Sequence, residues 1–298
     1  MSGQRPSEVS EGKLVAVWGP TGAPGRSTTA INLAAELALS GKRVLLIDAD
    51  TYGGSIAGYL ELFDETPGFL AVCRLAAMDQ LTDEELTRLL HEYGLEHGVS
   101  FTILTGIVNS LRWPEISAVR VRAALTELRQ RFDVIVVDVG FNLEEDEEIA
   151  SDVAAPRRNQ ATLEILHRAD VVVGVATADV IGLARYIHSY SRLGELVTAE
   201  VRTVINRAVA SEAASARHTL SRFAGITDSI TIPEDVGVYR RCSVVAAPLC
   251  VVGPQSGARK VIAALAESLA PIVGGVGARP VAAPAGRRWF SPRERAAS

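Results

Sequence analysis

The sequence predicts an α/β fold, a doubly wound and mostly parallel sheet with helices on both faces. Three observations point to it. Short β-branched apolar runs recur along the chain, helical patterns separate them, and a glycine-containing turn joins the first run to the first helical pattern. The runs are apolar nearly throughout, which is typical of strands buried on both faces. With 48% hydrophobic and 22% charged residues, the chain has a globular composition.

Some of the apolar runs are predicted to be strands, because each is too short for a buried helix. They are Leu14–Trp18, Val44–Ile47, Phe101–Leu104, Val134–Val137, Val171–Val175 and Val201–Ile205. Segments with apolar residues at three- and four-residue spacing are predicted to be helices. They are Ser27–Ser40, Glu115–Arg131, Ala161–Arg168, Ile181–Val197, Glu212–Phe223 and Gly257–Leu269.

These elements form one predicted domain at residues 14–271. The polar residues 1–13 are expected to be a disordered segment. Residues 272–298 are expected to be a flexible tail, because the last 20 residues carry five arginines against one glutamate. The tail holds a basic and aromatic cluster at 287–290 that could touch a membrane weakly. Its narrow apolar face favours a plain disordered tail instead.

The net charge and the cysteine content limit the classes of protein to which the chain could belong. Thirty Lys and Arg residues against 35 Asp and Glu residues give a net charge of −5, so no overall positive field attracts nucleic acid. Three cysteines without metal-ligand spacing, and no apolar signal segment, favour a reducing compartment, and we expect a cytoplasmic protein. The scattered histidines form no metal set, and no G-x-S-x-G hydrolase turn is present.

The turn after the first predicted strand has the layout of a phosphate-binding loop, strand then tight turn then helix. Gly22 and Gly25 would let the backbone approach phosphate, and Arg26 supplies a cation. Ser27 would provide the Mg²⁺ hydroxyl, and Thr28 would assist at the α-phosphate. The alternative is a plain Gly/Pro turn between a strand and a helix.

Several residues of this loop depart from the usual motif. Arg26 stands where the motif has Lys, and Pro20 stands where it has the first Gly. A planar guanidinium differs from a compact ammonium, so nucleotide binding should survive the exchange better than turnover. Pro24 has no N–H and removes one phosphate donor from the loop.

Three aspartates lie at the ends of predicted strands. Asp48 and Asp50 follow the second strand, and Asp138 follows the fourth. Carboxyl ends of parallel strands meet at the crevice where such sheets bind ligands, so these carboxylates are candidate site residues. Capping of strand ends is the alternative role.

At this point the chain resembles the MinD/ParA superfamily of deviant Walker A ATPases, and within it the CpaE/TadZ-like branch. The resemblance covers most of residues 14–270 and rests on five segments in order: GPTGAPGRSTTAINLAAELA, VLLIDADTYGGS, VIVVDVG, VINR and IPED. It implies a MinD/ParA-like P-loop NTPase fold, ATP and Mg²⁺ as cofactors, and two subunits that face each other across two ATP molecules.

The resemblance also implies roles for individual residues. Asp50 corresponds to the carboxylate that orients water, and Asp48 to a magnesium-associated switch residue. Asp138 corresponds to the Walker B carboxylate, which holds the metal through water or together with Ser27.

Residues that bracket the adenine follow from the same resemblance. They are Asn206, Pro233 and Glu234. An Asn side chain offers a donor and an acceptor, which suits the adenine edge. The alternative for Asn206 is an ordinary turn residue.

The family's signature lysine, which reaches the partner's nucleotide, is replaced here by Thr21. Residues 139–141, Val-Gly-Phe, also depart from the family's usual Ser/Thr-Pro-x-Gly. Loss of a phosphate-clamping cation removes transition-state stabilisation, so slow turnover or none is expected. Whether the chain is an enzyme therefore stays open at the level of sequence.

The predicted function is an ATP-binding switch or localisation protein of CpaE/TadZ type that acts as a homodimer within a pilus, secretion or cell-division assembly. One alternative is an active ParA-like partitioning ATPase that binds DNA. Another is a scaffold that has lost nucleotide. The acidic run Glu144–Glu148 could be a partner surface, and Arg157 and Arg158 could supply the missing cations. A solvated loop with local ion pairs is the simpler interpretation.

Overall fold

A computed structural model describes residues 11–23, 25–62, 68–107, 109–145, 157–274 and 288–289. Its strands form one sheet in the order β8-β7-β6-β1-β5-β2-β4-β3-β9. The strands are β1 (Lys13–Trp18), β2 (Val44–Ala49), β3 (His91–Gly94), β4 (Ser100–Leu104), β5 (Val134–Val139), β6 (Val171–Thr177), β7 (Glu200–Ala208), β8 (Ser229–Pro233) and β9 (Arg288–Trp289). Every pairing is parallel except that of β3 with β4, which confirms the predicted fold class.

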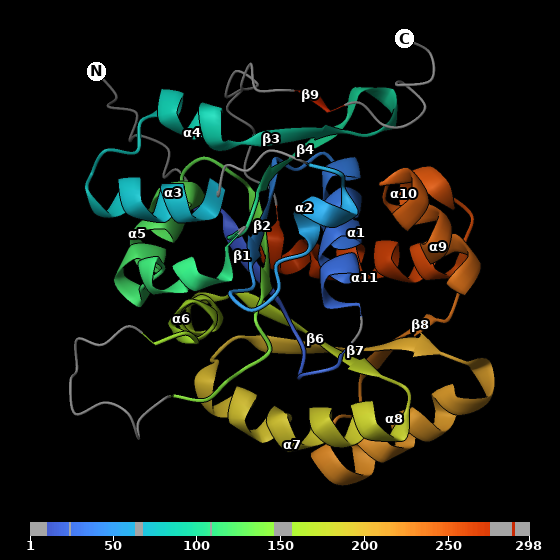
Figure 1. The fold of residues 1–298 in the computed structure, drawn as a ribbon. Coiled ribbons are helices and arrows are strands. Elements are labelled where there is room, and N and C mark those ends of the chain that lie inside the picture. Colours follow the sequence, from blue (N-terminus) through green and yellow to red (C-terminus); the bar gives the residue numbers. More distant parts are fainter. Residues whose placement is uncertain are drawn as a thin grey trace, which may run out of the picture.

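Helices cover both faces of the sheet (Figure 1). One buried cluster joins the sheet to α3 (Gly68–Ala77), α4 (Asp83–Leu89), α5 (Ala118–Arg129), α6 (Gln160–Arg168), α7 (Val180–Leu196) and α8 (Ala210–Ala224). The other cluster joins it to α1 (Arg26–Leu39), α2 (Ile56–Tyr59), α9 (Val236–Val245), α10 (Leu249–Val252) and α11 (Gly257–Val273). None of the described helices is long and apolar enough to cross a membrane.

The central strand β1 explains where the site forms. It lies between β5 and β6, and its residues Leu14 to Trp18 are fully buried because helices cover both of its faces. β2 pairs with the other edge of β5, in a register that sets Asp48 opposite Asp138. The carboxyl ends of these strands therefore meet beside the N-terminus of α1.

The six predicted strands and six predicted helices all occur, with end residues shifted by a few positions. β1 begins at Lys13, one residue before the predicted strand, and α11 extends to Val273. The predicted helix Glu115–Arg131 is too long at its N-terminus. A 3₁₀ turn at Ser110–Glu115 contains Pro114, and the α-helix starts after Ser117, whose hydroxyl accepts the N–H of Arg120 at 3.4 Å.

The sequence patterns did not predict β3, α9 or α10. β3 has the sequence HEYG, which carries a charge and a glycine and alternates too briefly to be distinctive. It pairs antiparallel with β4 and parallel with β9. α10 has only four residues, and α9 combines apolar and basic residues over ten. Of these elements, α9 completes a wall of the site described below.

Candidate functional site

The loop from β1 to α1 is tightly wound. Gly22 and Gly25 adopt φ angles of 70° and 106°, in the left-handed region that favours glycine. Gly25 precedes the first residue of α1, and its carbonyl accepts the hydroxyl of Thr28 at 3.0 Å and the N–H of Thr29 at 2.8 Å. The free N–H groups of the first helical turn therefore face the loop and form an anion-binding end. Pro24 lies outside the described residues.

Arg26 folds back inside this loop. Its Nη1 donates to the carbonyl of Gly19 at 2.9 Å, and its Nη2 donates to Oδ2 of Asp50 at 3.0 Å. The two side chains of the pair are only 15% and 7% exposed. The cation of the phosphate loop is thus present, largely covered by the chain and neutralised by the carboxylate that follows β2.

Asp50 accepts three hydrogen bonds from the described part of the chain itself. Its Oδ1 accepts the N–H groups of Tyr52 at 2.8 Å and Gly53 at 3.3 Å, while its Oδ2 accepts Arg26. Asp48 accepts the N–H groups of Asp50 at 3.2 Å and Ile56 at 3.1 Å. Both carboxylates therefore cap the turn after β2. They do so while lying in the crevice at the strand ends.

The surroundings of Asp138 and Asp48 change their ionisation. Burial, together with the nearby Asp48 charge, raises the pKa of Asp138 to about 8, against the hydrogen bond from Ser27. Burial raises the pKa of Asp48 to about 6, opposed mainly by the N–H of Ile56. Two like charges in a dry site are costly, so the Asp48 carboxylate raises the pKa of Asp138 and the Asp50 carboxylate raises that of Asp48.

The donor set around Asp138 fits a magnesium ion. Ser27 donates to the Asp138 carboxylate, and Ser55 donates to the Ser27 hydroxyl at 2.8 Å. Oδ1 of Asp138 is buried and has no hydrogen-bond partner among the described residues. No group of three or more His, Cys, Asp or Glu side chains in the described part of the chain could hold a metal alone. A metal here would need phosphate and water ligands as well, which is how Mg²⁺ binds in nucleotide sites.

A pocket of about 440 Å³ opens on the other side of the loop. Gly25, Thr28, Asn206 and Glu234 all line it, so the structure brings these predicted residues together. Asn206 lies within β7 beside a register shift, rather than in a turn, and its Nδ2 would be 2.0 Å from a Cβ placed on Gly25. Pro233 does not line the pocket itself but ends β8 next to Glu234.

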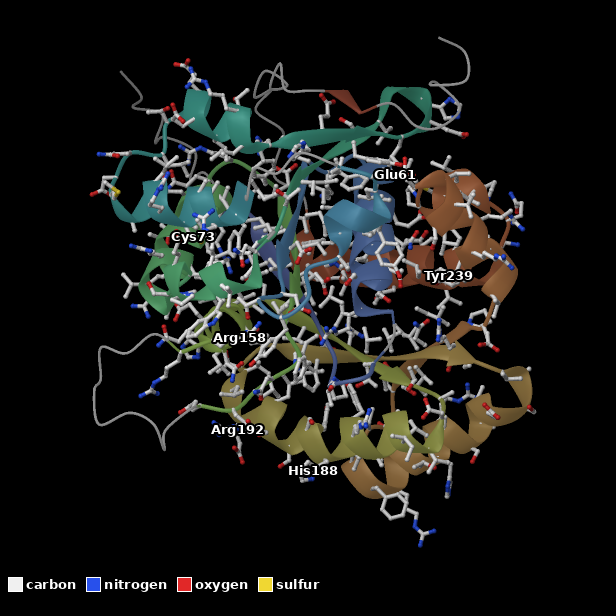
Figure 2. All side chains as sticks on the ribbon, in the orientation of Figure 1. Glu61, Cys73, Arg158, His188, Arg192 and Tyr239 are labelled. Atoms are coloured by element: carbon white, nitrogen blue, oxygen red, sulfur yellow. The ribbon has the colours of Figure 1, made fainter. Side chains whose placement is uncertain are left out.

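The far wall of this pocket was not predicted. It comes from α2 and α9, with Tyr59, Tyr239 and Cys242 among its lining residues. Tyr239 lies on the α9 side of the molecule, beside α1 (Figure 2). The tyrosines give the pocket flat apolar surfaces of the kind that pack against a purine ring. No motif links these aromatic residues to the loop, so only the fold could reveal them.

Arg158 contacts the turn that carries Asp50. Its guanidinium lies 4.0 Å from the ring centroid of Tyr52, and its Nη2 donates to the carbonyl of Thr51 at 2.9 Å. The hydroxyl of Tyr52 donates to Asn159 at 2.7 Å.

Of the acidic run Glu144–Glu148, Glu145 pairs with Arg192 at 3.0 Å. Residues 146–148 lie outside the described residues.

Comparisons with known proteins agree with this geometry. A family model described as an AAA domain matches residues 12–150. The maintenance of carboxysome distribution protein A of Synechococcus elongatus is 28% identical over 186 residues, which cover 60% of this chain and 64% of that protein. The sporulation initiation inhibitor protein Soj of Bacillus subtilis is 31% identical over 132 residues, 43% of this chain and 49% of that protein. The chain thus spans about half to two thirds of the length of these curated relatives.

Solved structures share the fold. A ParA family ATPase from Chlorobium tepidum superposes with a TM-score of 0.70 at 17% identity, covering 86% of this chain and 98% of that one. The septum site-determining protein MinD of Pyrococcus horikoshii, solved with Mg-ADP, superposes with a TM-score of 0.66 at 19% identity, covering 88% and 97%. The phosphate loop, the aspartates of β2 and β5 and these relatives thus agree in showing that the chain is similar to proteins of the MinD/ParA superfamily.

Proposed function

We propose that this chain is an ATP-binding switch or localisation protein of the CpaE/TadZ type. It binds ATP with Mg²⁺, hydrolyses it slowly or not at all, and positions or regulates a larger assembly. One observation carries the proposal: the crevice has a loop, a base pocket and a cation site, but its cation is Arg26 and is paired with Asp50. That combination supports binding more strongly than turnover.

Each part of the nucleotide has a candidate partner. Gly22, Gly25 and the first turn of α1 would wrap the phosphates, with Arg26 and Thr28 beside them. Asn206 and Glu234 would contact the adenine, with Pro233 supporting them from β8.

Ser27 and Asp138 would hold Mg²⁺, which would neutralise negative charge on the phosphates when bound. The unpartnered Oδ1 of Asp138 would then gain a partner, either the metal or one of its waters.

Slow turnover is expected because the loop has Arg26 in place of the usual Lys. Arg26 is also paired with Asp50, the candidate water-orienting carboxylate. Arg26 would have to leave Asp50 to reach phosphate. Its several N–H groups allow it to move to phosphate and still keep the Gly19 carbonyl. Nucleotide binding would therefore change the Arg26–Asp50 contact, which is a simple basis for a switch.

The cellular setting is inferred from the relatives. Their names refer to carboxysome distribution, chromosome partitioning and cell division, and all of these processes require positioning. We propose a homodimer that contacts protein partners of a pilus, secretion or division assembly. The net charge of −5 gives no general attraction to nucleic acid.

Calorimetry with ATP and Mg²⁺, together with an assay of phosphate release, tests the proposal. Heat of binding without appreciable phosphate release is the expected result. Rapid release together with salt-sensitive DNA binding would instead identify an active ParA-like partitioning ATPase. An absence of heat with every adenine nucleotide would identify a scaffold that has lost nucleotide.

A further inference from the structure

A second guanidinium touches the phosphate loop, and it comes from a different part of the chain. Nη1 of Arg185, on α7, donates to the carbonyl of Thr21 at 3.3 Å. A Cβ placed on Gly22 would lie 2.5 Å from the same Nη1, so the guanidinium rests directly against the Cα of Gly22. No sequence motif singles out Arg185, because it lies 164 positions after the residue that it contacts.

The charge of Arg185 is not neutralised within the described residues. Arg26 is paired with Asp50 at 3.0 Å, whereas no carboxylate in the described part of the chain lies within 4.0 Å of Arg185. Its side chain is exposed. A cation with one weak backbone contact and no counter-ion is available to bind an anion.

The packing of α7 fixes where Arg185 points. Asp179 caps the helix by accepting the N–H of Gly182 at 2.9 Å. Tyr186, the next residue after Arg185, is fully buried, and its hydroxyl lies 3.0 Å from that of Thr203. Because Tyr186 faces the sheet, Arg185 is held on the outer side of the helix, next to the loop.

The two ends of the loop have different neighbours. Asn206 lies against Gly25 at the end next to the base pocket, and Arg185 lies against Gly22 at the other end. Pro20, Thr21 and Arg185 line a separate hollow of about 630 Å³. A nucleotide whose base occupies the first pocket would extend its phosphates along the loop, away from Asn206 and toward Gly22.

We propose that Arg185 is the second phosphate-binding cation of this loop and contacts the terminal phosphate of a bound nucleoside triphosphate. This proposal rests on the proposed function, since it requires that the crevice bind nucleotide. It adds a basis for discrimination between triphosphate and diphosphate, because a diphosphate does not extend to the end of the loop that Arg185 occupies.

The test compares ATP and ADP binding, each with Mg²⁺, by calorimetry on the full chain. Arg185→Ala is expected to weaken ATP binding at least tenfold and ADP binding less than twofold. Arg192→Ala is the matched control: Arg192 lies on the same helix and lines the same hollow, but it is paired with Glu145 and Glu195, each at 3.0 Å (Figure 2). It should change neither affinity. Thermal unfolding monitored by circular dichroism checks that both variants fold.

A second variant separates charge from packing. Thr21→Lys in the Arg185→Ala background puts an ammonium group next to the contact that Arg185 makes, and it is expected to recover most of the lost ATP affinity. Equal loss of ATP and ADP binding in Arg185→Ala would overturn the proposal, as would unchanged affinity for both. If the wild-type chain binds ATP and Arg185→Ala binds it with the same affinity, only this proposal fails. If the wild-type chain binds neither nucleotide, the proposed function fails with it.

Discussion

Arg26 determines how the loop recognises phosphate, and its contacts lead to a direct prediction. Arg26→Lys is expected to keep or raise ATP affinity, because a compact ammonium suits a tightly wound loop. Arg26→Ala is expected to lose at least tenfold, about 1.4 kcal/mol, because the loop loses its buried cation. Titration calorimetry of the three proteins measures both effects. Equal affinity in all three would show that the side chain stays on Asp50 and Gly19 and does not serve phosphate.

Asp138 leads to a prediction about pH and stability. Burial raises its pKa in the folded state to about 8, from the ordinary value of 3.8, so the folded state holds its proton more tightly than the unfolded state. Stability from this group is therefore fully present below about pH 4 and is lost as the pH rises toward 8. In magnesium-free buffer, the wild type should lose on the order of 2 kcal/mol more than Asp138→Asn between pH 6 and pH 8.5. Urea unfolding at the two pH values measures this. Parallel losses in both proteins would contradict it.

At the level of elements, the loop depends on Gly25. A side chain there must adopt a φ of 106° and would place its Cβ 2.0 Å from Nδ2 of Asn206. Gly25→Ala is expected to cost about 1–3 kcal/mol of stability and at least tenfold in ATP affinity, because Asn206 must move. Gly41→Ala is the matched control: its φ is 87°, but nothing lies within 4 Å of the added Cβ. It should cost stability and leave ATP affinity unchanged, as measured by chemical unfolding and calorimetry.

The turn after β2 is held from outside by α6 and the residues before it. Arg158 stacks on Tyr52 and donates to Thr51, so Arg158→Ala is expected to destabilise the protein by about 1–2 kcal/mol. ATP affinity should stay within about twofold, because these contacts are made to the turn rather than to the phosphate loop. Arg157→Ala is the control and should have an effect below about 0.5 kcal/mol on unfolding. A large loss of ATP binding in Arg158→Ala would instead favour a role as a surrogate phosphate cation.

At the scale of the whole molecule, α7 exposes apolar surface near the phosphate loop. Val180 and Ile181 are 81% and 59% exposed at the start of α7. For the proposed homodimer, we expect ATP with Mg²⁺ to shift the chain from monomer to dimer in size-exclusion chromatography with light scattering. Ile181→Asp should abolish the shift, because a carboxylate is costly to bury at an interface. Val244→Asp, which replaces an exposed residue of α9, should not. A dimer that persists in Ile181→Asp would exclude this face.

Local sequence was sufficient for the fold class and for the candidate residues of the phosphate loop and the strand ends. β1, β5 and β6 are apolar nearly throughout because helices cover both of their faces, and the same pattern is visible in the amino-acid sequence. The sequence also predicts the glycines of the loop and the aspartates of β2 and β5. A strand-to-helix turn and a strand end need those residue types at fixed spacing. Short elements such as β3 and α10 could not be predicted, because a few residues show too little hydrophobic periodicity.

Which of those residues touch each other depended on packing. The pairing of Arg26 with Asp50 spans 24 positions, and the contact of Arg185 with Thr21 spans 164. Spacing in the chain encodes neither, because each contact depends on the sheet register and on where α7 packs against β6 and β7. The loop and its aspartates can thus be predicted from the amino-acid sequence. Where Arg26 and Arg185 lie relative to the phosphate loop is decided only when the chain folds.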